Sequence, residues 1–230
     1  MSGPSKQALI VAASRGLGLG LAREHLARGW RVVATVRKPS EALEAARAKA
    51  PDRLRIETVD IDHPEQVQAL RQRLEGERFD LLFVNAGVCG SAERPISQVS
   101  HDEFVREMTT NAFSPVRAAE ALYELVRPGG MIGFMTSVLG SVANNTSGGV
   151  EVYRASKAAL NMLVRSFAAR VAKDRTVLLL HPGWVRTDMG GAAAPVDVAT
   201  STRGLADVIA ARVGTGGVAF VDYQGRELPW

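Results

Sequence analysis

Short apolar runs alternate with longer amphipathic segments along most of the chain. Seven of these runs are rich in β-branched residues and almost continuous in hydrophobicity, which is typical of strands covered on both faces. A segment with helical periodicity separates each run from the next, and this alternation predicts βαβ units and a parallel sheet. The predicted strands are Ala8–Ala13, Arg31–Val36, Leu54–Val59, Leu81–Asn85, Met131–Thr136, Val177–His181 and Val218–Asp222.

The six intervening segments carry residues that begin and end helices. Gly29 follows the first segment in the position of a C-cap, and Pro64 occupies the first turn of the third. We therefore expect an α/β fold: one Rossmann-type, doubly wound domain over residues 1–230, with seven parallel strands and helices on both faces. The predicted helices are Gly16–Arg28, Ser40–Ala50, Pro64–Leu74, Asp102–Val126, Glu151–Lys173 and Ser201–Val213.

Two polar or glycine-rich segments interrupt this alternation, at about residues 138–150 and 189–203. Both follow predicted strands, and ligands of open α/β sheets bind beyond the carboxyl ends of the strands. We therefore expect these loops to contact the substrate, together with the segment Val88–Arg94. Their Asn, Ser and Gly content favours a small, polar substrate.

The composition is that of an ordinary globular domain, and it excludes several other classes of protein. The chain has 230 residues, of which 46% are hydrophobic, yet no apolar run is long enough to cross a bilayer. The first seven residues show no secretory signal, and the single cysteine, Cys89, is expected to pack as a small apolar side chain; both fit the cytoplasm. The net charge of +4 is dispersed, which argues against binding to nucleic acid.

Metal and hydrolase chemistry find no support in the sequence. The four histidines lie far apart and no cysteine cluster exists, so we expect no metal site. The Gly-x-Ser-x-Gly turn of serine hydrolases is also missing.

The first predicted strand leads into a turn with the sequence Ala13-Ser14-Arg15-Gly16-Leu17-Gly18. Glycines between a strand and a helix let the backbone approach a pyrophosphate, which the unpaired N–H groups of the helix then bind. A tight turn without a ligand is the alternative for such a motif taken alone. Its place in the first βαβ unit favours a dinucleotide site.

The end of the second predicted strand indicates which dinucleotide binds. The sequence Thr35-Val36-Arg37-Lys38 lacks the carboxylate that would bind the ribose 2′-hydroxyl of NAD. Arg37 and Arg15 are suited to hold a 2′-phosphate instead, unless both simply face solvent. We therefore expect NADP(H), with NAD(H) as the alternative.

Tyr153 and Lys157 lie four residues apart in a predicted helix, which places both on one face. A phenol ordinarily titrates near pH 10, and an adjacent ammonium favours the phenolate and lowers that pKa. A phenol tuned in this way could exchange a proton with an alcohol oxygen near neutral pH. On spacing alone, an ordinary surface pair is the alternative.

These motifs together resemble the short-chain dehydrogenase/reductase superfamily, in a subgroup similar to C-factor and the carbonyl reductases. The family's Thr-Gly-x-x-x-Gly-x-Gly motif aligns with residues 11–18, where Val11 and Ala12 replace the Thr and the first Gly. Ala12 adds a Cβ atom at a position where a positive φ would be costly. The segment Asn85-Ala86-Gly87 matches a second family motif.

The resemblance implies a catalytic set of Asn111, Ser137, Tyr153 and Lys157. In this interpretation Ser137 polarises the substrate carbonyl and Tyr153 transfers the proton, with Ser141 as the alternative serine. Lys157 would anchor the cofactor ribose and lower the pKa of Tyr153. Asn111 would hold a water molecule beside Lys157.

The resemblance also implies the cofactor contacts. Asp60 and Ile61 match the pair that contacts adenine, although a turn or helix cap is the alternative for Asp60. Val185 and Thr187 would approach the nicotinamide carboxamide. The predicted cofactor-binding residues are Ala12, Ser14, Arg15, Gly16, Leu17, Gly18, Arg37, Asp60, Ile61, Asn85, Ala86, Gly87, Tyr153, Lys157, Pro182, Gly183, Val185 and Thr187.

The expected function is that of an NADP(H)-dependent oxidoreductase that interconverts a carbonyl and an alcohol on a small molecule. The alternative is a weakly catalytic or non-catalytic dinucleotide-binding signal or sensor protein, similar to C-factor. The family also implies a homodimer or homotetramer assembled through the helices Asp102–Val126 and Glu151–Lys173.

Overall fold

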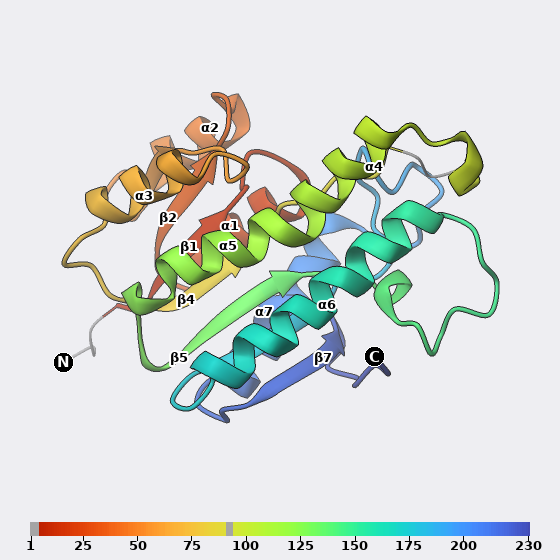
Figure 1. Cartoon of the computed structure of the whole chain (residues 1–230). Helices are drawn as coiled ribbons and strands as arrows, with labels where there is room; N and C mark the ends of the chain where they lie inside the picture. The colour runs from red at the N-terminus through yellow and green to blue at the C-terminus, as the bar shows by residue number, and fades with distance from the viewer. Residues whose placement is uncertain (1–4, 91–93) are drawn as a thin grey trace.

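Seven parallel strands form a continuous sheet in the computed structural model, which describes residues 5–90 and 94–230 (Figure 1). They lie in the order β3-β2-β1-β4-β5-β6-β7, so the direction of winding reverses between β1 and β4. This confirms the doubly wound fold predicted from the alternating pattern. The strands are β1 (Gln7–Val11), β2 (Arg31–Val36), β3 (Leu54–Thr58), β4 (Phe79–Val84), β5 (Val126–Met135), β6 (Thr176–His181) and β7 (Val218–Asp222).

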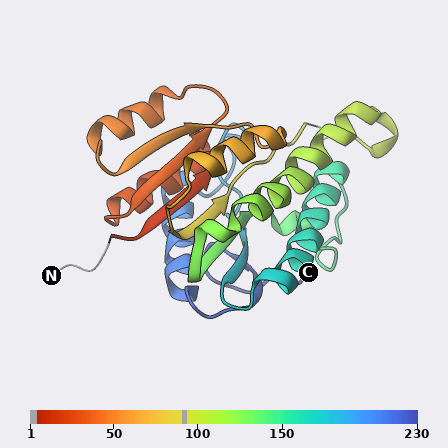
Figure 2. The ribbon, with the colours of Figure 1, turned by 60° about the vertical axis from the view of Figure 1, so that its left-hand side comes forward.

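Helices cover both faces of the sheet (Figure 2). Along β1, Ala8 and Ile10 face a core cluster beneath one helical layer, whereas Leu9 and Val11 face the cluster beneath the other. One layer contains α1 (Gly16–Ala27), α2 (Glu41–Lys49) and α7 (Val198–Arg212), and the other contains α3 (Pro64–Arg73), α4 (His101–Met108), α5 (Ser114–Leu122) and α6 (Glu151–Val171).

Side-chain caps determine where several helices begin. The hydroxyl of Ser40 accepts a hydrogen bond from Leu43 N at 3.3 Å at the start of α2. Ser100 and Glu103 form a capping box at the start of α4. At α7, Asp197 Oδ1 accepts from Thr200 N at 2.7 Å, so this helix begins at Val198, before the predicted start at Ser201.

The helix predicted over Asp102–Val126 is not continuous. A π-helical turn, η2 (Thr109–Phe113), separates α4 from α5, and a 3₁₀ turn, η3 (Tyr123–Leu125), leads into β5. Ser114 N donates to Thr109 O, five residues earlier, and Pro115 favours this wider turn because it has no N–H for the carbonyl four residues earlier and its ring crowds that carbonyl. Shorter 3₁₀ segments are η1 (Ile96–Gln98) and η4 (Val138–Gly140).

Strand β5 begins at Val126, five residues before the predicted start at Met131. Val126 pairs with Phe79 of β4, and the register shifts between Phe79 and Leu81, opposite the Pro-Gly-Gly sequence of residues 128–130. Within residues 5–90 and 94–230, none of the helices has the length and apolar character needed to span a bilayer.

We expect Phe167→Ala to lower the free energy of unfolding by about 3–5 kcal/mol, because it leaves a cavity in the core under α6. The Phe167 ring is fully buried and packs edge-to-face on Phe134 and Tyr123, with ring centroids 6.2 and 6.0 Å away. Urea unfolding measures the change. The exposed neighbour Ser166 provides the control, since Ser166→Ala should change stability by less than about 0.5 kcal/mol. Equal effects of the two substitutions would contradict this packing.

Candidate active site

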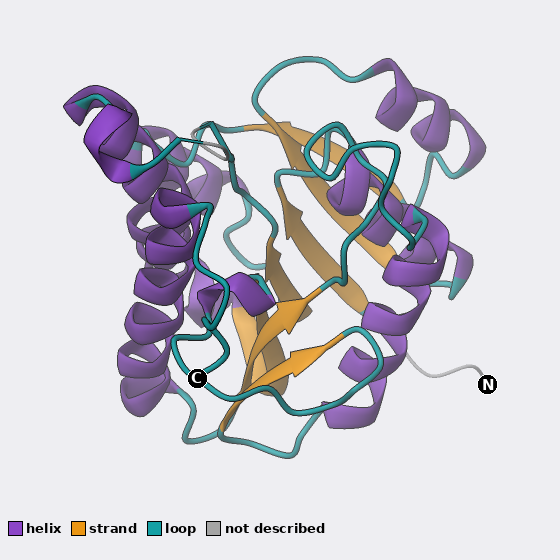
Figure 3. Cartoon of the chain, turned by 90° about the vertical axis from the view of Figure 1, so that its right-hand side faces the viewer, coloured by secondary structure: helices purple, strands orange, loops and turns teal. Residues whose placement is uncertain are grey.

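The carboxyl ends of β1, β4, β5 and β6 border a pocket of about 780 Å³. The loops that follow these strands gather on this side of the molecule, between the two helical layers (Figure 3). The predicted residues that line the pocket are Arg15, Gly16, Leu17, Asn85, Gly87, Ser137, Tyr153, Lys157, Pro182, Gly183, Val185 and Thr187. The structure therefore brings together side chains from five separate parts of the sequence.

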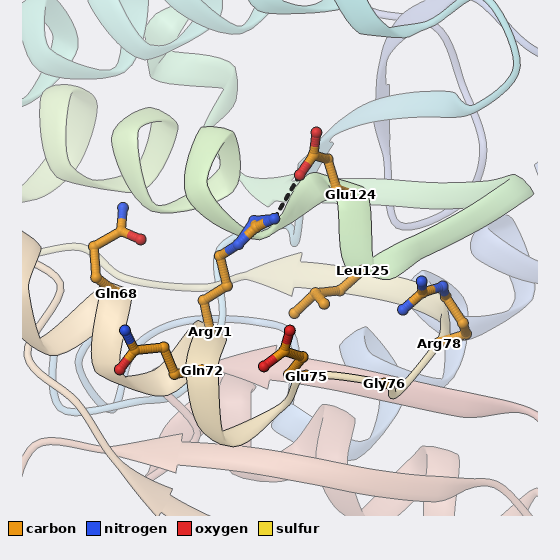
Figure 4. A pocket seen from close by; sticks show the side chains of 8 residues that line it. All are labelled: Gln68, Arg71, Gln72, Glu75, Gly76, Arg78, Glu124 and Leu125. Carbon is orange, nitrogen blue, oxygen red and sulfur yellow. Dashed lines mark hydrogen bonds and ion pairs between the residues drawn. The ribbon is translucent and has the colours of Figure 1, made fainter.

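A second hollow, of about 570 Å³, lies between α3 and η3 and contains none of the predicted residues (Figure 4). Arg71 crosses it to Glu124 at 2.5 Å and also donates to Ala121 O at 3.1 Å. Its arginine, glutamate and glutamine side chains lie apart from the glycine-rich turn and from the predicted catalytic residues. The pocket at the carboxyl edge is the candidate site.

The glycine-rich turn after β1 forms a tight cradle at one end of this pocket. A Cβ atom on Gly18 would lie 2.3 Å from Ala12 O and 2.7 Å from Asn85 Nδ2, so no side chain fits there. Asn85 Nδ2 donates to Ala12 O at 3.0 Å and ties the turn to the end of β4. Gly16 has a φ of +52°, in the left-handed region that favours glycine.

Ala12 also lies in the left-handed region, with a φ of +64°. Its N–H donates to Thr35 Oγ1 at 3.1 Å, and Ala13 N donates to Thr35 O at 2.7 Å, so β2 holds the strained turn in place. The conformational cost expected where Ala12 replaces the motif glycine is therefore present in this chain.

Tyr153 and Lys157 occupy the first turns of α6, and both line the pocket. Lys157 is 2% exposed; its Nζ lies 5.7 Å from the centroid of the Tyr153 ring and donates to Met135 O at 3.1 Å. Ser137, just after β5, is 8% exposed, and its Oγ accepts from Leu139 N at 3.1 Å. The carboxyl end of β5 and the first turns of α6 thus bring the hydroxyl of Ser137, the phenol of Tyr153 and the ammonium of Lys157 together in the pocket.

Burial governs the titration of this group. Burial lowers the pKa of Lys157 to about 8, while Cys89 and Glu107 act in the opposite direction. Burial raises the pKa of Tyr153 above its ordinary value; Cys89 and Glu107 add to this, and a hydrogen bond with Ser137 opposes it. The expected lowering of the Tyr153 pKa by Lys157 is therefore wrong for this structure. Desolvation disfavours the phenolate more than its surroundings stabilise it.

Asn111 lies in the π-helical turn and is fully buried. Its Oδ1 accepts from Val88 N at 2.7 Å, and its Nδ2 donates to Val88 O at 2.8 Å and to Ser156 Oγ at 2.9 Å. Asn111 does not line the pocket, but its Oδ1 would lie 3.5 Å from a Cβ atom on Gly87, and Lys157 Nζ would lie 3.3 Å from the same atom. Asn111 and Lys157 therefore meet at this glycine.

The two arginines expected to select the cofactor have exposed side chains near acidic residues. Arg15 forms an ion pair with Asp188, in the loop after β6. Arg37 Nη1 lies 4.0 Å from Asp60 Oδ2, and Asp60 Oδ1 accepts from Asp62 N at 3.1 Å. Seven predicted cofactor contacts lie outside the lining of the pocket: Ala12, Ser14, Gly18, Arg37, Asp60, Ile61 and Ala86.

Several residues of the pocket were not identified from the sequence. Cys89, interpreted as an apolar packing residue, lines the pocket and is partly buried, and burial raises the pKa of its thiol. His181 also lines it. Its Nδ1 is buried without a hydrogen-bond partner among the described residues, and burial lowers its pKa to about 4. The sequence feature that could have identified Cys89 and His181 is their position at or just after the end of a predicted strand. Part of the predicted loop Val88–Arg94, residues 91–93, lies outside the described residues.

Comparison with known proteins finds a matching family model, similar sequences and similar solved structures. The family model for short chain dehydrogenase matches residues 6–196. The C-signal protein of Myxococcus xanthus is 42% identical over 154 residues, covering 66% of this chain and 92% of that protein.

Among solved structures, a Burkholderia multivorans protein described as a short-chain dehydrogenase/reductase, with NADP bound, is 49% identical. Its TM-score is 0.96, and the match covers 99% of this chain and 100% of that one. A carbonyl reductase from Pseudomonas aeruginosa in complex with NADP is 40% identical, with a TM-score of 0.92 over 99% and 100% of the two chains.

We expect Ala12→Gly to raise the free energy of unfolding by about 1 kcal/mol, because glycine adopts a φ of +64° without the steric cost borne by alanine. Thermal or urea unfolding measures the change. Ala13 is the matched control: it is fully buried and has no positive φ, so Ala13→Gly should destabilise the fold. A destabilised Ala12→Gly variant would show that the turn carries no such strain.

Proposed function

The chain belongs to the short-chain dehydrogenase family, and from this premise we propose that it is an NADP(H)-dependent oxidoreductase that interconverts a carbonyl compound and its alcohol. The observation that carries the proposal is the convergence of Ser137, Tyr153 and Lys157 on one pocket, next to the cradle of the β1–α1 turn. The presence of NADP in complexes of the Burkholderia and Pseudomonas proteins supports the choice of cofactor.

The residues present fit a dinucleotide. The cradle has no space for a Cβ atom at Gly18, which lies in the first turn of α1. No side chain caps this helix, so its first N–H groups are available for a pyrophosphate. Pro182, Gly183, Val185 and Thr187 line the opposite wall. Thr187 Cγ2 would lie 3.6 Å from a Cβ atom on Gly16, so the two walls approach each other there. The cofactor would lie between them, with Lys157 binding its ribose.

The bound cofactor supplies a hydride to the carbonyl carbon in reduction and accepts one in oxidation. Ser137 donates a hydrogen bond to the carbonyl oxygen, and Tyr153 gives that oxygen its proton. Because burial raises the Tyr153 pKa, the phenol stays protonated at neutral pH and is ready to donate. Alcohol oxidation needs the phenolate form of Tyr153, so the raised pKa means that oxidation requires a higher pH than reduction.

We propose the loops at about 138–150 and 189–203 as the substrate-binding segments. Val138, Leu139 and Val150 of the first, and Met189 and Gly190 of the second, line the pocket. Trp184 also lines it and is 57% exposed, so its indole is available to an apolar part of a substrate.

Assembly through the long helices is also a proposal. Phe113 and Met162 are 54% and 65% exposed, and they lie on η2 and α6, on the helical layer that the resemblance assigns to subunit contacts. A homodimer or homotetramer would bury such side chains. Sedimentation of the purified protein measures the oligomeric state.

The function is tested by following NADPH consumption with a panel of aldehydes, ketones and diketones. The similarity to C-signal keeps a dinucleotide-binding signal protein as the second candidate. Turnover of any carbonyl supports the enzyme, whereas NADPH binding by calorimetry without turnover of any carbonyl would favour the signal protein. Absence of binding would reject both.

We expect Tyr153→Phe to lower kcat for carbonyl reduction roughly 10²–10⁴-fold, because the variant lacks the proton donor. Its affinity for NADPH, measured by calorimetry, should stay close to that of the unmodified protein. Tyr123→Phe is the control, since Tyr123 packs on Phe167 away from the pocket and should retain activity. Near-normal turnover by Tyr153→Phe would reject the assigned role.

Arg37→Ala should weaken NADPH binding roughly tenfold to a hundredfold, since charge-assisted hydrogen bonds contribute about 1.5–3 kcal/mol. Binding of NADH, which lacks the 2′-phosphate, should change little. Arg31→Ala, at the opposite end of β2, is the control and should affect neither cofactor. Equal loss of NADPH and NADH affinity in Arg37→Ala would show that Arg37 does not recognise the phosphate.

A further inference from the structure

We propose that Glu107 is a positioning residue of this active site: its buried carboxylate holds the segment that follows β4 and sets a negative charge in the surroundings of Tyr153 and Lys157. The inference rests on the proposed function, because it assigns Glu107 to the same reaction. It extends that function to a side chain that neither touches the cradle nor belongs to the predicted catalytic set.

Glu107 and Asn111 act on the same short segment. Glu107, in the last turn of α4, is 2% exposed, and its Oε2 accepts from Gly90 N at 3.3 Å. Asn111, four residues later, forms two hydrogen bonds with the backbone of Val88. Cys89 lies between these two attachment points and lines the pocket. The two side chains therefore hold the wall of the pocket that Cys89 forms.

The electrostatic surroundings of Tyr153 and Lys157 come from several elements. Four charged or titratable residues line the same pocket from the loops after β1, β4 and β6: Arg15, Cys89, Arg186 and Asp188. His181 lines it from the end of β6. Arg106 and Glu107 approach from α4, where Arg106 Nη2 would lie 3.0 Å from a Cβ atom on Gly90. Of these groups, Cys89 and Glu107 raise the pKa of both Tyr153 and Lys157. Because burial makes the Cys89 thiol harder to ionise, the Glu107 carboxylate is the group to test.

The direction of this effect favours reduction. Proton donation needs the phenol form of Tyr153, and ribose binding needs the ammonium form of Lys157. Both forms are lost as the pH rises through their pKa values, which produces an alkaline limit to activity. Glu107 raises both pKa values and so moves that limit to higher pH. It partly offsets burial, which alone lowers the pKa of Lys157.

A structural role alone would not require a charge at this position. Burying a carboxylate is costly, and a glutamine could accept the same hydrogen bond from Gly90 N. Glu107→Gln keeps the shape of the side chain and removes the charge, so it separates the two roles. Asp102→Asn makes the same change of charge on the same helix at a fully exposed side chain and is the matched control.

The first measurement is the pH profile of kcat/KM for carbonyl reduction. We expect the alkaline limb of Glu107→Gln to lie roughly one pH unit below that of the unmodified enzyme. Asp102→Asn should keep the original limb, and Glu107→Asp, which retains the charge, should restore most of it. An unchanged limb in Glu107→Gln, or an equal shift in Glu107→Asp, would overturn the proposal.

The second measurement needs no substrate. Cys89 is the only cysteine of the chain, and its thiol pKa is raised by burial and by Glu107 and lowered by Lys157. Alkylation by iodoacetamide follows the thiolate. Below the midpoint, Glu107→Gln should therefore react roughly tenfold faster than the unmodified protein at the same pH. Equal rates would contradict a charge at Glu107 that acts on this pocket.

The two measurements separate this inference from the proposed function. An unmodified protein that reduces no carbonyl would reject the function, while alkylation of Cys89 would still test the charge. An active enzyme whose pH limit and alkylation do not respond to Glu107→Gln would reject only the role of Glu107. If Glu107→Gln fails to fold, the pH dependence of Cys89 alkylation in the unmodified protein provides the test. A thiol pKa at or below that of glutathione would contradict the proposal.

Discussion

The burial of the Lys157 ammonium at the carboxyl edge of the sheet is the constraint on which the site depends. A charged group 2% exposed is costly unless its hydrogen bonds are satisfied, and the carbonyl of Met135 at the end of β5 accepts one of them. This contact fixes the first turns of α6 against β5, and Tyr153, four residues earlier, is thereby placed beside Ser137. The chemistry of the pocket thus follows from how one helix meets one strand.

The other side of the pocket depends on backbone geometry. The turn after β1 combines positive φ values at Ala12 and Gly16 with a position, Gly18, that has no space for a side chain. Asn85 and Thr35 hold this turn from the neighbouring strands β4 and β2. The strain lies where the winding of the sheet reverses, and ligands of such sheets bind at that point.

Most of the fold could be predicted from the sequence because buried parallel strands are nearly continuous apolar runs. The break in the helix over Asp102–Val126 was missed, since a π-helical turn follows from the ring of Pro115 rather than from any hydrophobic period. Spacing correctly brought Tyr153 and Lys157 together, but it predicted the wrong direction for the Tyr153 pKa. That direction depends on burial, which the spacing of two residues does not reveal. The pocket position of Cys89 and the hydrogen bond from Gly90 N to Glu107 depend on how the segment after β4 packs against α4, so they became visible only in the structure.

The most direct test of the account is a crystal structure with NADPH bound. It should show the pyrophosphate at the Gly16–Gly18 turn, the Lys157 Nζ at the nicotinamide ribose and the Tyr153 hydroxyl facing the nicotinamide ring. A structure in which that hydroxyl points away from the ring, or in which the cofactor lies outside this pocket, would contradict it.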